Sequence, residues 1–197
     1  MSFLNLVQQR RSQYALSDKS PLSDEQLQTL LEATVKQAPS AFNSQSARVL
    51  LLLGEKHAQF WQLVREELQK IVPVDKFAPT REKLKSFSDG YGTILFFEEW
   101  KTVELLQTKY PAYKNNFPVW AYQSNGMLEF AVWVALAEQG IGASLQHYNP
   151  LIDKAVEIAY QLPSSWKLVA QMPFGTPTAP ARKKDFLPLE ERVQVLK

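Results

Sequence analysis

The clearest pattern along this chain is the recurrence of apolar residues at helical spacing. Ser2 is a good N-cap for the first such stretch. Ser23 and Gln26 form a capping box before the second stretch, and Pro39 closes it. Together with the later stretches, this spacing predicts helices over residues 3–11, 24–38, 55–71, 80–87, 98–109, 118–139 and 150–160.

Short apolar runs bounded by glycine or proline predict the strands. They cover residues 47–53, 92–97, 141–145 and 166–172. Near the C-terminus, Val193 and Val195 alternate with polar residues, which predicts a short final strand. The segment 173–188 contains four prolines, so we expect it to be irregular.

The helix predicted over residues 118–139 differs from the others, because apolar residues cover nearly all of its faces from Met127 to Ala137. Pro118 suits its first turn and Gly140 its end. A helix that is apolar all round has to be covered all round. We therefore expect it to be fully buried at the centre of a homodimer, because one small protomer has too few layers to cover it.

The predicted helices outnumber the strands, and the two kinds of element do not alternate regularly. This order predicts an α+β fold, with one small central sheet flanked by helices. The chain has 197 residues and shows no repeat or linker, so we expect a single domain over residues 1–197.

Composition excludes several kinds of chemistry. The chain has no cysteine and only two histidines, which excludes disulfides, thiol catalysis and thiolate metal sites. A formal net charge of +2 gives no general signal for nucleic-acid binding. No apolar run reaches the roughly 18 residues of a membrane-spanning helix, and the N-terminus lacks the apolar core of a secretory signal. We expect a cytoplasmic protein that binds no metal, nucleic acid or membrane.

The first candidate site residues are Arg10, Arg11 and Ser12, where the first predicted helix ends. Guanidinium groups can bind a phosphate through paired hydrogen bonds, and the serine hydroxyl can add another. The alternative is that the two arginines only interact with the dipole at the C-terminus of the helix.

The second candidate group is Ser40, Asn43 and Gln45, just before the first predicted strand. In an extended segment Asn43 and Gln45 point to the same side, where their amides can match the donors and acceptors of a planar heterocycle. An ordinary turn is the alternative, because proline, serine and asparagine all favour turns.

Two further segments contain polar residues that could contribute to a site. Gly140 and Gly142 follow the long apolar helix, and small residues there let a ring approach the backbone. His147 comes soon after them and is a candidate proton donor, although a lone histidine is more often structural or on the surface. The basic cluster 182–184 could add charge to a phosphate site or could be the solvated face of a loop.

The order and spacing of these motifs resemble the nitroreductase family. An Arg-Arg-Ser motif ends an early helix, and Pro-Ser-x-x-Asn-x-Gln follows the next helix. A long apolar helix then leads through glycine into a short strand, and a proline-rich basic stretch comes last. The motifs Arg-Arg-Ser-Gln-Tyr-Ala-Leu and Leu-Gln-His-Tyr-Asn-Pro are similar to the compact, fatty-acid-repression-type branch of that family.

This resemblance implies a nitroreductase-like fold with a mostly antiparallel sheet, an intertwined homodimer, and FMN bound at two sites across the interface. NADH or NADPH is the implied co-substrate. Residues 188–197 are implied to cross to the partner and to add Val193 and Val195 to its sheet. The implied flavin-binding residues are Arg10, Arg11, Ser12, Ser40, Asn43, Gln45, Ser144, Leu145, Gln146, and either Arg182 or Lys184, with Lys184 slightly favoured.

We therefore predict an FMN-dependent oxidoreductase that transfers hydride from NAD(P)H to an acceptor such as a nitroaromatic or a quinone. The cofactor performs the chemistry, so no side-chain nucleophile is required in a chain without cysteine. One alternative is a flavin-binding regulatory or sensor protein with negligible turnover. A second is a flavin-free helical interaction protein.

Overall fold

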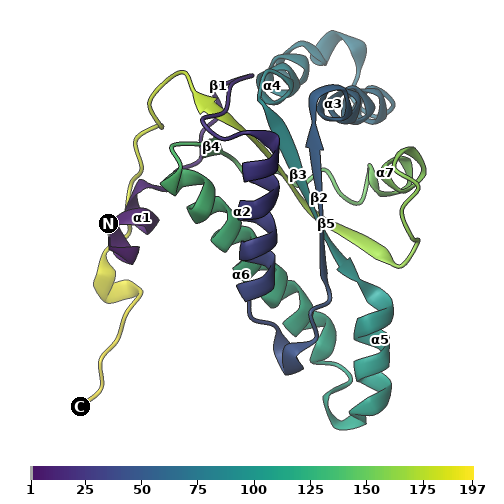
Figure 1. The fold of residues 1–197 in the computed structure, drawn as a ribbon, viewed down its shortest axis with the longest axis vertical. Coiled ribbons are helices and arrows are strands. Elements are labelled where there is room, and N and C mark those ends of the chain that lie inside the picture. The colour runs from purple at the N-terminus through teal and green to yellow at the C-terminus, as the bar shows by residue number, and fades with distance from the viewer. Residues whose placement is uncertain (1) are drawn as a thin grey trace.

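The computed structural model describes residues 2–197 and has an α+β fold (Figure 1). Its helices are α1 (Phe3–Gln9), α2 (Asp24–Gln37), α3 (Gly54–Gln69), α4 (Ala78–Ser88), α5 (Trp100–Lys109), α6 (Phe117–Glu138) and α7 (Asp153–Ala159). Its strands are β1 (Leu16–Ser17), β2 (Ala47–Leu53), β3 (Gly92–Glu99), β4 (Gly142–Ala143) and β5 (Trp166–Pro177).

The helix boundaries follow from the capping residues. The Ser2 hydroxyl accepts a hydrogen bond from the Asn5 amide at 3.3 Å and so starts α1. Ser23 and Gln26 form both halves of a capping box at the start of α2. Both predicted starts are confirmed.

The sheet has the order β1-β5-β3-β2, and β4 also pairs with β5. All of these strand pairs are antiparallel, and an isolated parallel bridge joins Ser12 to Ala143. The predicted mostly antiparallel sheet is therefore confirmed. Within the described residues, β2 is an edge strand with β3 as its only neighbour.

Helices cover both faces of the sheet. Ile94 and Phe96 of β3 pack with α2 and α6 on one face. Leu95 and Phe97 alternate with them and pack with α3, α4 and α7 on the other face. The sheet is thus the middle of three layers (Figure 1).

Helix α6 is covered fully on the side that faces the sheet, and α1 and α5 cover its other side only in part. Leu128, Val132 and Leu136 are buried against the sheet and α2. In contrast, 46% of Met127 and 37% of Phe130 are exposed. This agrees with the expectation that one protomer has too few layers to cover α6 completely, and the burial of Met127 and Phe130 by a partner stays a prediction.

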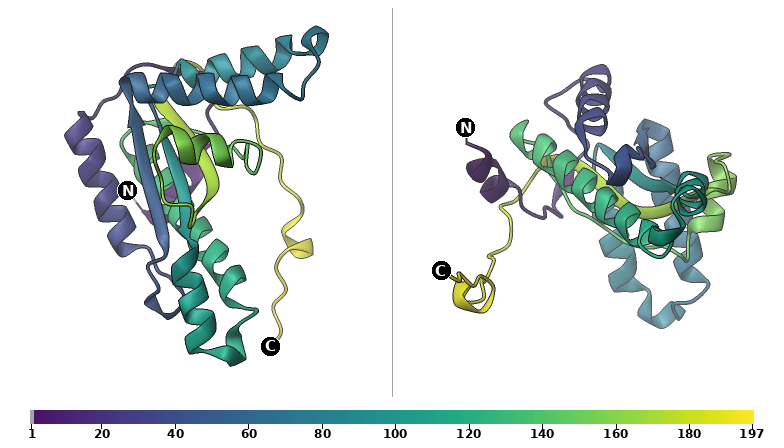
Figure 2. Two further views of the ribbon diagram at one scale, coloured as in Figure 1. Left: turned by 90° about the vertical axis from the view of Figure 1, so that its right-hand side faces the viewer. Right: turned by 90° about the horizontal axis from the view of Figure 1, so that it is seen from below.

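After Arg182, which contacts Arg11, the C-terminal tail runs away from the rest of the molecule (Figure 2). Leu189–Glu191 form one 3-10 turn, and Val193 and Val195 are exposed outside any strand. The single chain does not form the predicted final strand, since a strand needs a neighbouring edge and none of the described residues offers one beside this tail. A strand formed on the sheet of a partner stays a prediction.

Two other boundaries differ from the prediction, and the sheet contains one further strand. Strand β3 extends through Glu98 and Glu99, which were expected in a helix, because both residues pair with β5. Strand β5 continues to Pro177, where the missing N–H falls at the strand end. Its last residues pair with β1, a two-residue strand that the apolar pattern did not predict.

Two more predicted elements are shorter in the structure. Of the strand predicted over residues 141–145, only Gly142 and Ala143 pair with β5. Helix α7 begins at Asp153 instead of residue 150. No helix among residues 2–197 is long and apolar enough to cross a membrane.

Candidate functional site

The first part of the candidate site is built around Arg10, which caps the C-terminal end of α1. Its guanidinium carbon lies 4.4 Å from the ring centroid of Trp133 on α6. The Arg10 Nε atom is buried and has no hydrogen-bond partner. Burial, and to a lesser degree the charge of Arg11, lower the pKa of Arg10. Arg10 is therefore held in place with an unused donor.

The two ends of the chain meet at Arg11. Its Nη2 atom donates a hydrogen bond to the main-chain carbonyl of Arg182. The Arg182 guanidinium carbon lies 5.6 Å from the ring centroid of Tyr14, so a third cation joins the same region. None of the ion pairs among residues 2–197 involves Arg10, Arg11 or Arg182. This arrangement leaves positive charge available for an anion.

Lys184 lies apart from these contacts. Its Nζ atom is 5.1 Å from the ring centroid of Phe186 in the exposed tail. Of the two alternatives for the late basic residue, the structure brings Arg182, and not Lys184, into contact with Arg11.

The segment after α6 lies beside the N-terminal motif. Ser12 bridges to Ala143, and the Gln13 amide donates to the Ala143 carbonyl at 2.9 Å. The approach is close at Gly142, where a Cβ atom would lie 2.7 Å from the side chain of Pro177 and 2.9 Å from that of Gln13. Gly142 is therefore required by chain packing, which is how the segment comes so near to residues 12–13.

Ser144 and Gln146 are buried and hydrogen-bonded to each other, with Gln146 Nε2 donating to Ser144 Oγ at 3.0 Å. Leu145 between them is half-buried. His147 comes next and is exposed. The structure thus groups Arg10, Arg11, Ser12, Ser144, Leu145, Gln146 and Arg182 at one end of α6.

The second part of the candidate site is a strained turn at residues 40–45. Phe42, Asn43 and Gln45 have φ angles of 56°, 50° and 48°, in the left-handed region that non-glycine residues rarely adopt. The expectation that Asn43 and Gln45 lie in an extended segment is therefore wrong. Both side chains are nevertheless exposed.

Hydrogen bonds from both ends hold this turn in place. Ser40 Oγ accepts from the Gln45 amide at 2.9 Å, so the Ser40 side chain closes the turn itself. The Ala41 amide donates to Ser124 Oγ of α6 at 3.3 Å. Strain of this kind persists only where surrounding contacts determine the backbone, and it is concentrated at functional sites.

A buried polar pair supports the end of the turn. Asn125 Nδ2 donates to Glu98 Oε1 at 2.8 Å and to the Phe97 carbonyl at 3.1 Å. Ser46 is buried close by, and its carbonyl accepts from the Glu99 amide at 2.9 Å. Burial raises the pKa of Glu98. Sequence reasoning missed this pair, although a glutamate that directly follows the apolar run of β3 was a signal for it.

Aromatic rings surround the exposed side of the turn. Half of Phe42 is exposed, and its ring centroid lies 4.8 Å from Tyr110, 5.3 Å from Phe117 and 6.1 Å from Trp120. A cavity of about 360 Å³ is lined by Ala41, Phe42, Trp120, Gln123, Ser124 and Met127. A second cavity of about 610 Å³ lies on the side of α2 and β2, and Ser40, Gln45 and Ser124 line it too.

The single chain does not bring the two parts of the site together. The first part packs against Trp133 and the second against Ser124, and these residues are nine positions apart on α6. At 1.5 Å per residue, that separation is about 14 Å along the helix axis. Both parts nevertheless lie along one helix.

Comparisons with known proteins agree with this fold and these motifs. The family model described as "Nitroreductase family" matches residues 7–176. "Putative nitroreductase HBN1" of Saccharomyces cerevisiae is 33% identical over 188 residues, which is 94% of this chain and 93% of the relative. "Nitroreductase FRM2" of the same organism is 30% identical over 189 residues, again 94% and 93% of the two chains.

A solved structure shows the same similarity. "Nitroreductase CinD from Lactococcus lactis in complex with chloramphenicol" is 42% identical, covers 100% of both chains and superposes with a TM-score of 0.91. The same protein in complex with 4-nitrophenol gives a TM-score of 0.90 at the same identity and coverage.

Proposed function

This chain belongs to the nitroreductase family, and from that premise we propose that it is an FMN-dependent oxidoreductase. It transfers hydride from NADH or NADPH to an electron acceptor such as a nitroaromatic or a quinone. When bound, FMN supplies the chemistry of taking up and passing on the hydride. The protein supplies binding, orientation and electrostatics.

The observation that carries this proposal is the uncompensated positive charge where the two chain ends meet. Arg10, Arg11 and Arg182 lie near one another and have no acidic partner among residues 2–197, where Arg10 Nε is also a buried donor without an acceptor. A phosphate group can satisfy such donors, because guanidinium and phosphate form paired, charge-assisted hydrogen bonds. We assign these residues to the FMN phosphate, and Ser12 to the phosphate and ribityl oxygens.

The remaining residues of the first part of the site fit a flat ring. Ser144, Leu145 and Gln146 would line it, because the hydrogen bond between Ser144 and Gln146 fixes this strip of chain. Asn43 and Gln45 would face the ring edge with their exposed amides. The strained turn presents these amides in a fixed position, and Glu98 and Asn125 support that turn as positioning residues.

We also propose that the protein is a homodimer with two shared sites. A two-fold partner packed on α6 can cover Met127 and Phe130, which the single chain leaves exposed. It can also bring its own residues 40–45 to the first part of the site, which lies about 14 Å along α6 from the turn of the same chain. The exposed tail, residues 188–197, would cross to the partner and place Val193 and Val195 at a free sheet edge such as that of β2.

The aromatic wall at the turn supports a flat aromatic acceptor. Phe42 presents an exposed face beside Trp120, and aromatic rings stack favourably with such faces. The relative from Lactococcus lactis has been solved in complex with chloramphenicol and with 4-nitrophenol, both of which carry a nitroaromatic ring. These names support nitroaromatics as acceptors for this chain.

An absorption spectrum tests the proposal most directly. We expect the purified protein to show a flavin spectrum that is bleached rapidly by NADH or NADPH under anaerobic conditions and restored by a nitroaromatic. Bound flavin that resists bleaching by both nucleotides would favour a flavin-binding regulatory or sensor protein. A colourless protein that does not bind added FMN would contradict the proposal.

A further inference from the structure

A second group of cations lies between α3 and α4, on the face of the sheet opposite α6. Arg65 of α3 and Arg81 of α4 both line two neighbouring cavities, of about 260 Å³ and about 340 Å³. The two arginines therefore stand at the boundary between these cavities. We propose that this place is a binding site for a small organic carboxylate with an apolar body.

The charges at this place are not balanced by the protein. No aspartate or glutamate is among the residues that line either cavity. Arg65 takes part in none of the ion pairs among residues 2–197, and Arg81 has only a 3.8 Å contact with Glu82 in which both side chains are exposed. Such an exposed pair contributes little. Two guanidinium groups that line the same two cavities, with no carboxylate among the lining residues, favour an anion there.

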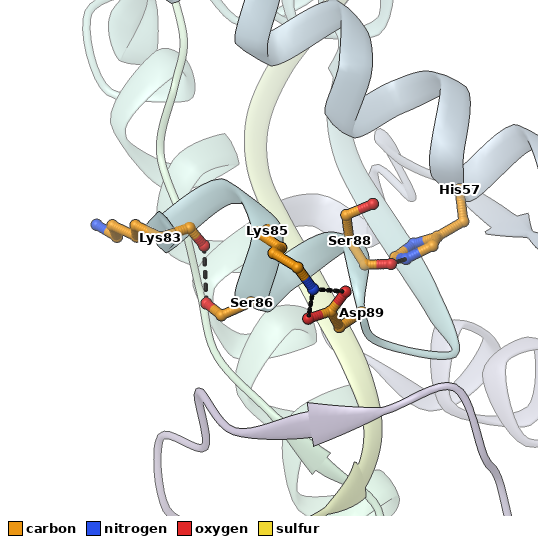
Figure 3. A network of polar contacts seen from close by, with 6 residues as sticks. All are labelled: His57, Lys83, Lys85, Ser86, Ser88 and Asp89. Atoms are coloured by element: carbon orange, nitrogen blue, oxygen red, sulfur yellow. Dashed lines mark hydrogen bonds and ion pairs between the residues drawn. The ribbon is translucent and has the colours of Figure 1, made fainter. Parts of the chain in front are cut away.

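The third cation of this group is already neutralised. Lys85 Nζ contacts both carboxylate oxygens of Asp89, at 2.6 and 2.8 Å, and Figure 3 shows this pair together with Ser88 and His57. The charge left for a ligand is therefore that of the two arginines. This balance fits a single carboxylate better than a group with several negative charges.

A buried donor also points to a ligand at this place. The Nε atom of Arg65 is buried and has no hydrogen-bond partner. A buried donor without an acceptor costs about 1–3 kcal/mol, so native proteins generally satisfy such donors. A carboxylate between Arg65 and Arg81 would supply the acceptor once the Arg65 side chain turns this N–H group toward the cavity, because guanidinium and carboxylate match in a paired geometry.

The larger cavity determines the class of carboxylate. Val72, Val74, Phe77 and Ala78 line it beside the two arginines. Val74 is 93% exposed, so its side chain lies at the open rim of the cavity, where a ligand can contact it. The volume of about 340 Å³ is at the lower end of the usual range for small-molecule pockets. The carboxylate would lie at the arginines and the hydrocarbon body against Val72, Val74 and Phe77.

Titration of the FMN-loaded protein with sodium hexanoate tests this proposal, with binding measured by calorimetry and by the NMR signal of the Arg65 Nε–H group. We expect saturable binding to one site per chain and a shift of that signal. Arg65→Gln and Arg81→Gln should each weaken binding about tenfold or more, as expected for the loss of a charge-assisted hydrogen bond. Flavin content and thermal unfolding midpoint should remain those of the wild type.

Lys83→Gln is the matched control, because it removes one positive charge from α4 at a residue that lines neither cavity. Lys83 also points away from the Lys85–Asp89 pair in Figure 3. We expect this variant to bind hexanoate like the wild type. Equal losses in all three variants, or no loss in the two arginine variants, would overturn the site.

Two other solutes test the ligand class. 1-Hexanol should bind at least tenfold more weakly than hexanoate, because it lacks the charge that the arginines recognise. Inorganic phosphate should also bind more weakly, because it cannot use the apolar cavity. Phosphate binding that is tighter than that of hexanoate would overturn the assignment to an apolar carboxylate. Because this site lies on the other face of the sheet, its failure would leave the flavin proposal unaffected.

Discussion

The two helical layers of this protein differ in how completely the chain buries their apolar side chains and pairs their polar groups. On the side of α3, α4 and α7, His57, Trp61 and Thr93 form a buried hydrogen-bonded network. On the side of α6, Met127 and Phe130 remain exposed. The chain itself satisfies the buried polar network of the first layer, whereas the apolar surface around Met127 and Phe130 in the second layer lacks cover.

In the His57 network, the chain itself supplies a hydrogen-bond partner for each buried polar group. His57 Nε2 lies 3.2 Å from the Ser88 carbonyl and must donate to it, because a carbonyl only accepts. Nδ1 then accepts from Thr93 Oγ1 at 2.8 Å, and Thr93 Oγ1 accepts from Trp61 Nε1 at 2.9 Å. Neutral His57 satisfies every group in this network, and burial lowers the pKa of His57. The α6 layer has no comparable closure around Arg10, which suits a surface that binds ligand and partner.

A charge placed on the open side of α6 should have the largest effect. We expect Met127→Glu to convert the dimer into a monomer and to release FMN, because a carboxylate buried without a partner costs on the order of 3 kcal/mol or more. Sedimentation at low micromolar concentration and the flavin absorbance measure both effects.

The control for this substitution is Ile158→Glu on α7, which also places a carboxylate at an exposed apolar position. We expect that variant to remain dimeric and to keep its flavin. A wild-type protein that is a stable monomer with one FMN per chain would contradict both the interface and the shared site.

The second effect concerns Glu129 of α6, which is buried to 7% exposure. Burial raises the pKa of Glu129 to about 7. The folded protein then holds this proton between pH 4.5 and 7, whereas the unfolded chain has lost it. Stability should therefore fall as the pH rises through this window, by up to about 3 kcal/mol.

Chemical denaturation from pH 4.5 to 8 measures this dependence on pH, and Glu129→Gln should remove it. His57 in the opposite layer should contribute the reverse slope, because its lowered pKa means that the unfolded chain binds the proton more readily below pH 6.5. An unchanged pH profile in Glu129→Gln would show that this carboxyl is not held neutral.

Removal of an arginine from the cluster where the chain ends meet should have a smaller but selective effect. We expect Arg11→Gln to weaken FMN binding by about 2 kcal/mol, or roughly thirtyfold, because a charge-assisted hydrogen bond to phosphate is lost. Riboflavin lacks the phosphate, so its binding should change little. Lys184→Gln is the matched control, since Lys184 contacts the ring of Phe186 in the exposed tail, whereas Arg11 contacts Arg182. Equal losses for FMN and riboflavin in Arg11→Gln would contradict the phosphate assignment.

The sequence predicts those features that depend on local contacts. The Ser23 capping box fixes the start of α2, and the apolar run of β2 fixes a strand. Glu98 was assigned to a helix, because its place in β3 depends on pairing with Lys167, about seventy residues later. The meeting of Arg11 and Arg182 is likewise a long-range contact that only the order of the motifs indicated.

Two predictions depend on a partner that the single chain does not contain. The apolar pattern of α6 and of the tail marks residues that need cover, and the predictions of burial and of a final strand place that cover in a homodimer. The single chain provides it for Leu128 and Val132 but not for Met127 or Val193. An apolar sequence pattern indicates which side chains need to be buried. It does not indicate whether the same chain or a partner buries them.

The smallest expected effect is that of substituting His147, which the sequence indicates as a candidate proton donor. His147 is exposed at the end of the segment that contains Ser144 and Gln146, and no hydrogen bond of its side chain fixes it within the described chain. A required proton donor is normally held in place by hydrogen bonds, as His57 is in the layer of α3, α4 and α7. We expect NAD(P)H to reduce the flavin bound to His147→Ala at a rate within about tenfold of the wild-type rate. This difference corresponds to a change in activation free energy of less than about 1.4 kcal/mol. Stopped-flow absorbance measures this rate, and His57→Gln should instead lower the unfolding midpoint. The opposite result would be a His147→Ala variant that retains FMN but whose flavin NAD(P)H no longer reduces. His147 would then be an essential acid-base residue, and catalysis would depend on more than cofactor binding and orientation.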